Sequence, residues 1–303
     1  MPVSQRPPRT AARPVLLVLV GIASVQFGAS IAKSLFDEVT PTEMVWLRLA
    51  TSVVVLLAVA RPRFSGRSRL DWTLVLGFGL SLGVMNLAIY QAFARIPLGI
   101  AVTIEFIGPL AIAVLGSRRA RDLAWVGLAG AGVVLLGAER ADLDVLGVLF
   151  ALLAGAAWGA YILLSGAVGR HWGGLDGLAI ASLVALAMVT PLLTTTDVSG
   201  LGDPRIILLG IAVGLLSSAL PYSCEMVALR DLRAATFGIL MSLEPAAAAL
   251  AGLLIIDEQL SAVQWLAIGC VVAASIGATR SARPSGAAAE AGGPPAPPVS
   301  AGT

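Results

Sequence analysis

The chain is a series of long apolar runs separated by short polar connections. Runs of roughly 16 to 24 residues, each close to the length of about 20 that a membrane-crossing helix needs, cover 14–33, 43–60, 72–93, 98–116, 123–138, 146–165, 177–196, 205–229, 234–256 and 262–279. The runs are continuous rather than alternating, which excludes a closed β-barrel. The pattern therefore predicts an all-helical polytopic membrane protein of ten transmembrane helices.

The composition supports a membrane protein. Hydrophobic residues make up 57% of the chain, charged residues 13%, and the mean hydropathy is +0.90, whereas a soluble domain is about 25% charged. The net charge is only +2 and the basic residues form short clusters between apolar runs, so no nucleic-acid partner is expected. Cys224 and Cys270 fall inside apolar runs, so no disulfide framework is expected.

The two ends of the chain are expected to be tails. Arginines precede the first apolar run, as in a secretory signal, but that run continues to about Ala32, the length of a full span. We therefore expect a cytoplasmic tail over residues 1–13, followed by the first helix. Residues 280–303 are mostly Ala, Gly, Pro and Ser, and they predict a disordered cytoplasmic tail.

The charged residues alternate between connections and indicate an orientation. Arginines gather in the N-terminal tail and on alternate connections, at Arg61, Arg63, Arg67, Arg69, Arg118, Arg119, Arg121, Arg170, Arg230, Arg233, Arg280 and Arg283. The intervening connections carry mainly Asp and Glu. By the positive-inside rule both termini are cytoplasmic, which requires an even number of spans.

Two halves of the chain are weakly similar. Leu123–Ala138 aligns with Val263–Ala278, and Gln26–Ala29 aligns with Ala157–Ala160. The halves, 14–138 and 146–279, each hold five spans, so the second lies upside down relative to the first. Inverted repeats are typical of secondary transporters; the alternative is a chance alignment of two apolar segments.

Several stretches resemble a known family. Met85–Pro109 resembles the third and fourth helices of the threonine/homoserine exporters, which belong to the drug/metabolite transporter superfamily of EamA type. Ser242-Leu-Glu-Pro245 and Glu258–Trp265 resemble the second copy of the repeat in that superfamily. The resemblance covers nearly the whole chain between the tails.

The resemblance implies a function. It implies two inverted copies of five helices and export of small amino acids across the bacterial inner membrane, with coupling to the proton gradient. The expected partners are then an amino-acid substrate, the lipid bilayer and protons, while the oligomeric state stays open. The nearest alternative is a transporter of another solute, such as an organic cation, a drug or a nucleotide-linked sugar, and the distant one is a membrane scaffold or intramembrane enzyme.

Prolines inside the apolar runs mark candidate helix breaks. Pro109 and Pro245 occupy corresponding positions of the two halves, which points to a binding site, and Pro221 interrupts the eighth run. A proline cannot bond to the carbonyl four residues back, so Pro109 frees the carbonyl of Glu105. Ordinary packed kinks are the alternative.

Uncharged polar groups provide candidate substrate ligands. Asn86 and Tyr90 lie one turn apart on the third span, and the repeat offset aligns Asn86 with Tyr222. Together with Glu105, these groups suit the ammonium and hydroxyl of an amino acid. They could equally bond across helices as packing contacts.

Three charged residues are expected within the membrane. From the helix rise, Arg48 and Glu105 lie about 8 and 10 Å from the outer end of their spans. They could form a structural or gating pair that holds Glu105 ionised, or Arg48 could extend to the outer headgroups. Glu244 is expected near the midplane and is our candidate proton carrier.

Motifs for other chemistry lack the required context. Gly79-Leu-Ser-Leu-Gly83 matches a hydrolase motif but lies inside a span, and the chain has one histidine, His171, in a loop. The single lysine, Lys33, follows Ala32, so the chain has no P-loop. We therefore expect no catalytic residues, no metal site and no cofactor.

Overall fold

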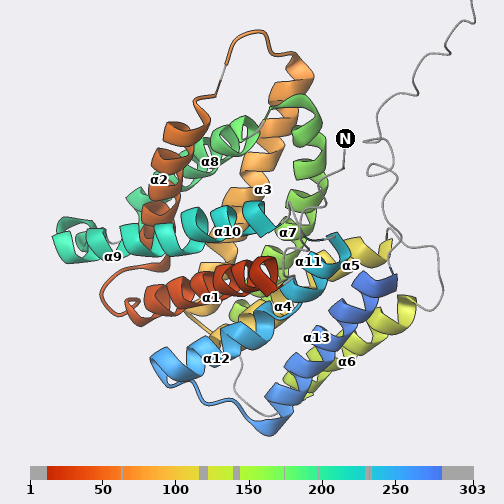
Figure 1. Ribbon diagram of the computed structural model, residues 1–303. Coiled ribbons are helices and arrows are strands. Elements are labelled where there is room, and N and C mark those ends of the chain that lie inside the picture. Colours follow the sequence, from red (N-terminus) through yellow and green to blue (C-terminus); the bar gives the residue numbers. More distant parts are fainter. Residues whose placement is uncertain are drawn as a thin grey trace, which may run out of the picture.

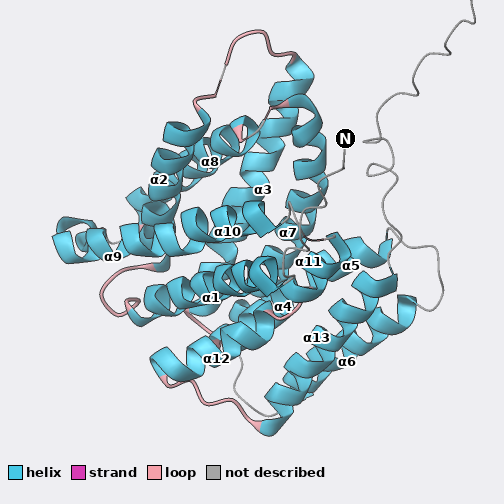
Figure 2. Cartoon of the chain, in the orientation of Figure 1, coloured by secondary structure: helices cyan, strands magenta, loops and turns pink. Residues whose placement is uncertain are grey.

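The computed structural model describes residues 12–62, 64–115, 122–138, 144–173, 175–196, 198–228, 232 and 234–281, and every regular element among them is a helix (Figure 2). The first half contains α1 (Ala12–Ser34), α2 (Pro41–Ala60), α3 (Arg69–Phe93), α4 (Leu98–Glu105), α5 (Ile107–Leu115) and α6 (Asp122–Ala138). The second half contains α7 (Val145–His171), α8 (Asp176–Val189), η1 (Thr190–Thr195), η2 (Ser199–Gly202), α9 (Pro204–Gly214), η3 (Leu215–Ala219), α10 (Leu220–Ala228), α11 (Ala234–Met241), α12 (Glu244–Ile256) and α13 (Ala262–Ser281). Apart from the first residues of α1 and the last of α13, the expected tails lie outside the described residues.

The helices are suited to a lipid environment. Seven of the described helical segments are long and apolar enough to cross a membrane, and shorter apolar helices occupy the remaining three expected ranges, at Leu98–Ile112, Leu123–Leu135 and Pro204–Ala219. Large apolar side chains such as Val54, Leu115 and Leu254 are exposed, whereas Gln26 and Asn86 are buried. Apolar groups outside and polar groups inside are the distribution expected of a multi-pass membrane protein.

Local sequence explains where the helices begin. Thr40 caps α2: its hydroxyl accepts from the Glu43 backbone N–H, and the Glu43 carboxylate accepts from the Thr40 backbone N–H. Ser68 and Asp71 form the same reciprocal box at the start of α3. These caps satisfy backbone donors that the first helical turn leaves without partners.

Three of the expected single spans are interrupted helices. The fourth range divides at Phe106 into α4 and α5, and the ninth divides at Ser242 and Leu243 into α11 and α12. The eighth range runs from α9 through a π-helical turn, η3, into α10. Each interruption lies just before Pro109, Pro245 or Pro221, because proline removes the backbone donor that would close the preceding turn.

The helices pack across the two halves of the chain. In Figure 1, α1 lies between α10 and α12, and α6 lies beside α13. α3 packs along α7 and α8, and α4 packs against both α7 and α12. Helices of each half are therefore covered mainly by helices of the other.

At the tightest crossing, the backbones of α5 and α7 lie against each other with no side chain between them. A Cβ added to Gly155 would lie 2.6 Å from the Glu105 carbonyl oxygen, and one added to Gly108 would overlap the carbonyl oxygen of Gly155. The helix break at Phe106 thus rests directly on the α7 backbone. Small residues permit such close approach of membrane helices.

We expect Gly108→Ala to destabilise the protein because its methyl group meets a backbone oxygen that no rotamer change can move. Overpacking of this kind typically lowers the free energy of unfolding by about 1–3 kcal/mol. The measurement is the thermal midpoint of the detergent-purified protein. Gly130→Ala in α6 is the matched control, since a Cβ there meets nothing within 4 Å; equal midpoints for the two variants would contradict the close crossing.

Candidate functional site

A cavity of about 460 Å³ lies among helices of both halves. Its volume falls in the range of about 300–1,000 Å³ that is usual for small-molecule sites. Polar and charged side chains from six helices and η3 reach it: Gln26, Arg48, Asn86, Glu105, Ser217, Glu244, Ser275 and Thr279. Apolar and aromatic side chains complete the wall.

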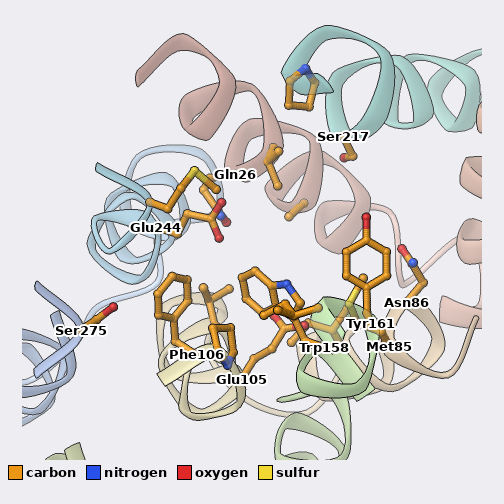
Figure 3. Close-up of a pocket in the computed structure, with 18 of the residues that line it drawn as sticks. Gln26, Met85, Asn86, Glu105, Phe106, Trp158, Tyr161, Ser217, Glu244 and Ser275 are labelled. Atoms are coloured by element: carbon orange, nitrogen blue, oxygen red, sulfur yellow. The ribbon is translucent and has the colours of Figure 1, made fainter. Parts of the chain in front are cut away.

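Two carboxylates line this cavity from different halves. Glu105 ends α4 at the helix break, and Glu244 begins α12 just after the Ser242–Leu243 break. Both side chains are buried, with 8% of their surface exposed. In Figure 3, Glu105 lies with Phe106 and Trp158 on one wall, and Gln26 and Glu244 face them from the other.

Arg48 is held in the cavity wall by a backbone oxygen and an aromatic ring. Its Nη2 donates to the Ser217 carbonyl at 3.4 Å, and its guanidinium carbon lies 5.5 Å from the centre of the Tyr90 ring. The face of an aromatic ring attracts a cation. Tyr90 is fully buried, so the ring forms a fixed platform for the arginine.

The break at Pro221 makes this oxygen available. Pro221 has no N–H to bond the carbonyl of Ser217, four residues earlier. The π-helical turn η3 has one more residue than an α-helical turn at this point. The Ser24 hydroxyl donates a hydrogen bond to the neighbouring Leu216 carbonyl at 2.6 Å. The sequence-predicted break thus supplies an acceptor for a charged side chain on α2.

The ion pair that the sequence suggested between Arg48 and Glu105 is not formed. Among the described residues, no ion pair joins the two side chains, although both line the cavity. Arg48 instead contacts the Ser217 carbonyl and the Tyr90 ring at the cavity.

The other sequence-predicted site residues divide between the cavity and its surroundings. Asn86 lines the cavity and donates to the Leu82 carbonyl at 2.8 Å. Pro109 and Pro221 are lining residues. Tyr90 lies behind the wall and Pro245 is buried outside the lining, while the side chain of Tyr222 lies outside what the structure describes.

Some lining residues are not among the site residues that the sequence suggests. Gln26 and Ser217 both line the cavity, where Gln26 Oε1 and Ser217 Oγ are buried with no hydrogen-bond partner among the described residues. Phe106 and Trp158 form an edge-to-face pair in the cavity wall, with their ring centres 5.2 Å apart. Trp158 carried a signal that could have found it, since it occurs mid-span whereas Trp46, Trp72, Trp125 and Trp265 occur at run ends.

An ion pair lies near the cavity, at the C-terminal end of α1. Lys33 lies one turn beyond the lining residue Ala29, and its Nζ contacts Glu258 Oε1 at 2.5 Å and the Ile96 carbonyl at 2.7 Å. Glu258 Oε2 accepts from the Leu98 backbone N–H at 2.8 Å. This cluster joins α1, the α3–α4 connection and the α12–α13 connection.

The described residues contain no group of three or more His, Cys, Asp or Glu side chains placed to hold a metal ion. His171 lies away from the cavity, where its Nδ1 contacts Asp71 Oδ1 at 2.7 Å. The cavity is therefore a site of charged, amide, hydroxyl and aromatic groups, which can bind a small polar molecule.

The sequence matches known transporters. Residues 145–280 match the EamA-like transporter family. The chain is 43% identical over 276 residues to the threonine/homoserine exporter RhtA of Escherichia coli, covering 89% of this chain and 92% of that protein, and 42% identical over the same shares to RhtA of Salmonella typhimurium. It is also 31% identical to the uncharacterized transporter YwfM of Bacillus subtilis, over 54% of this chain and 57% of that protein.

The fold also matches a solved structure. A protein crystal structure superposes with a TM-score of 0.61 at 21% sequence identity, covering 88% of this chain and 97% of that chain. At this identity the match concerns the fold alone. The extent of the sequence similarity, together with the helical membrane fold, shows that this chain belongs to the EamA-like transporters of the drug/metabolite transporter superfamily.

Proposed function

We propose that this protein is a secondary transporter that exports small amino acids such as threonine and homoserine across the bacterial inner membrane by proton antiport. The observation that carries the proposal is the similarity to threonine/homoserine exporters over 92% of their length. The cavity supports it, because it presents cationic, anionic and hydroxyl-bonding groups inside an apolar bundle. A bound amino acid would exchange its hydration for these groups.

We propose further that 14–138 and 146–279 are inverted repeats that move against each other. The packing supports this proposal. If the two halves are equivalent, α1 corresponds to α7, and α3 corresponds to α9 and α10. The contact between α3 and α7 then has its counterpart in the contact between α1 and α10. The pair α6 with α13 maps onto itself. A cavity between such repeats can open alternately to either side.

One feature favours a second candidate, a transporter of organic cations. Two carboxylates and the rings of Phe106 and Trp158 share the cavity, and carboxylates and aromatic faces both attract cations. Arg48 in the same wall opposes this candidate. Competition between threonine and a quaternary ammonium compound in the flux assay below distinguishes the two.

Overproduction in a bacterial host should lower internal threonine and homoserine and raise tolerance to both amino acids in the medium. The measurement is the internal concentration after loading the cells with a threonine dipeptide, compared with cells that carry the empty vector. Unchanged internal concentrations, with the protein present in the membrane, would contradict amino-acid export.

We propose that both termini are cytoplasmic, and cysteine labelling tests this. With Cys224 and Cys270 replaced by alanine, Ser65→Cys in the α2–α3 connection should react in intact cells only with membrane-permeant maleimides. Thr195→Cys, at the end of η1, should react with impermeant ones. Both side chains are exposed, so access to the reagent decides the result; the reverse pattern would overturn the orientation.

We propose that Glu244 carries the coupled proton, because ionisable groups at membrane depth that line a cavity commonly form proton pathways. Glu244→Gln should abolish flux driven by a pH gradient in proteoliposomes and leave threonine–threonine exchange intact. Glu38→Gln, at an exposed carboxylate, is the control. Retained pH-driven flux in Glu244→Gln would remove this role from Glu244.

A further inference from the structure

The guanidinium of Arg48 has donors that the protein does not use. Within the described residues, its side chain makes one hydrogen bond, to the Ser217 carbonyl, and its only aromatic contact is the Tyr90 ring. A guanidinium carries more N–H groups than one bond occupies, arranged to match the two oxygens of a carboxylate. Because Arg48 lines the cavity, these donors are available to a molecule inside it.

No carboxylate of the described chain forms an ion pair with this arginine. Ion pairs of other cations lie elsewhere, such as Lys33 with Glu258 and Arg205 with Glu38. A charge at membrane depth requires a counter-charge, a carbonyl or water. Ser217 provides a carbonyl, and a negative group in the cavity would complete the neutralisation.

Glu105 presents the opposite charge in the same cavity. Its carboxylate is buried and makes no hydrogen bond or ion pair within the described residues. Gln26 Oε1 and Ser217 Oγ, which have no hydrogen-bond partner in the described part of the chain, are further acceptors in the lining. An ammonium group has three donors and no acceptor, so it suits such a set of oxygens.

Two opposite charges that share a cavity without touching match a ligand that carries both. The zwitterion of a free α-amino acid has a carboxylate and an ammonium on one carbon atom. We propose that Arg48 binds the α-carboxylate of the substrate and Glu105 its α-ammonium, so that the cavity selects free α-amino acids. This assignment rests on the proposed amino-acid export and names the groups that recognise the substrate.

The assignment separates recognition from coupling. With the substrate bound, Arg48 and Glu105 each face an opposite charge, so the bound pair adds no net charge to the cavity. Glu244 belongs to the other half and is not needed for this match. The short threonine or homoserine side chain would then contact the wall of Phe106 and Trp158.

Modified ligands test the Arg48 assignment and the Glu105 assignment separately. Threoninol keeps the ammonium of threonine but has an alcohol in place of the carboxylate, and N-acetylthreonine keeps the carboxylate but has no ammonium. We expect wild-type protein in detergent to bind threonine more tightly than either, by about ten- to a hundredfold, the range for a hydrogen bond to a charged group. Thermal-shift titration with each compound gives the dissociation constants.

The variants assign each loss to a side chain. Arg48→Gln should weaken threonine binding by about ten- to a hundredfold and leave threoninol binding nearly unchanged. Glu105→Gln should weaken threonine and leave N-acetylthreonine nearly unchanged. Arg205→Gln, which changes an exposed arginine outside the cavity, should alter none of these constants.

The outcomes distinguish this inference from the proposed function. Wild-type protein that binds neither threonine nor homoserine overturns amino-acid export itself. Wild-type protein that binds threonine no more tightly than threoninol, or an Arg48→Gln variant that loses both ligands equally, overturns the Arg48 assignment alone. If Arg48→Gln does not fold, Arg48→Lys is the second variant, because it keeps the charge but not the paired N–H donors of a guanidinium. Selectively weaker binding of threonine by this variant supports the Arg48 assignment. An unchanged preference for threonine over threoninol overturns it.

Discussion

A helix in lipid has no water to which an unpaired backbone carbonyl can bond. Pro109 and Pro221 each remove the donor from one carbonyl, so the structure must place another group beside it. The Glu105 carbonyl lies against Gly155 of α7, and the Ser217 carbonyl accepts from Arg48 of α2. Both breaks occur at the cavity wall, so satisfying the backbone also determines which side chains face the cavity.

The two solutions have different consequences. At Gly155 the freed carbonyl is covered by backbone, which brings α5 and α7 together and leaves the Glu105 side chain at the cavity. At Ser217 the acceptor draws in a cation, and the buried Tyr90 ring supports it from behind. A charge that would be unfavourable in lipid is thereby kept at the cavity that Glu105 also lines.

The helices could be predicted because hydropathy over a whole span is a strong signal, and proline indicated where three of them are interrupted. The depths of Arg48 and Glu105 followed from the helix rise, but depth does not determine which way a helix faces. Among the described residues the two side chains form no ion pair, and Arg48 contacts the Ser217 carbonyl and the Tyr90 ring instead. Gln26 and Trp158 could not be assigned to one cavity without the packing of α1 and α7 around it.

The Lys33–Glu258 cluster differs physically from the α5–α7 crossing. Lys33 and Glu258 keep 19% and 15% of their side-chain surface exposed, and the contact between them is made by side chains. The α5–α7 contact is backbone against backbone, and no side chain can rearrange there. At the Lys33–Glu258 cluster α1 meets the α3–α4 and α12–α13 connections, whereas the crossing continues along two helices. The cluster can therefore rearrange through its side chains, whereas a change at the crossing requires the two helices themselves to move.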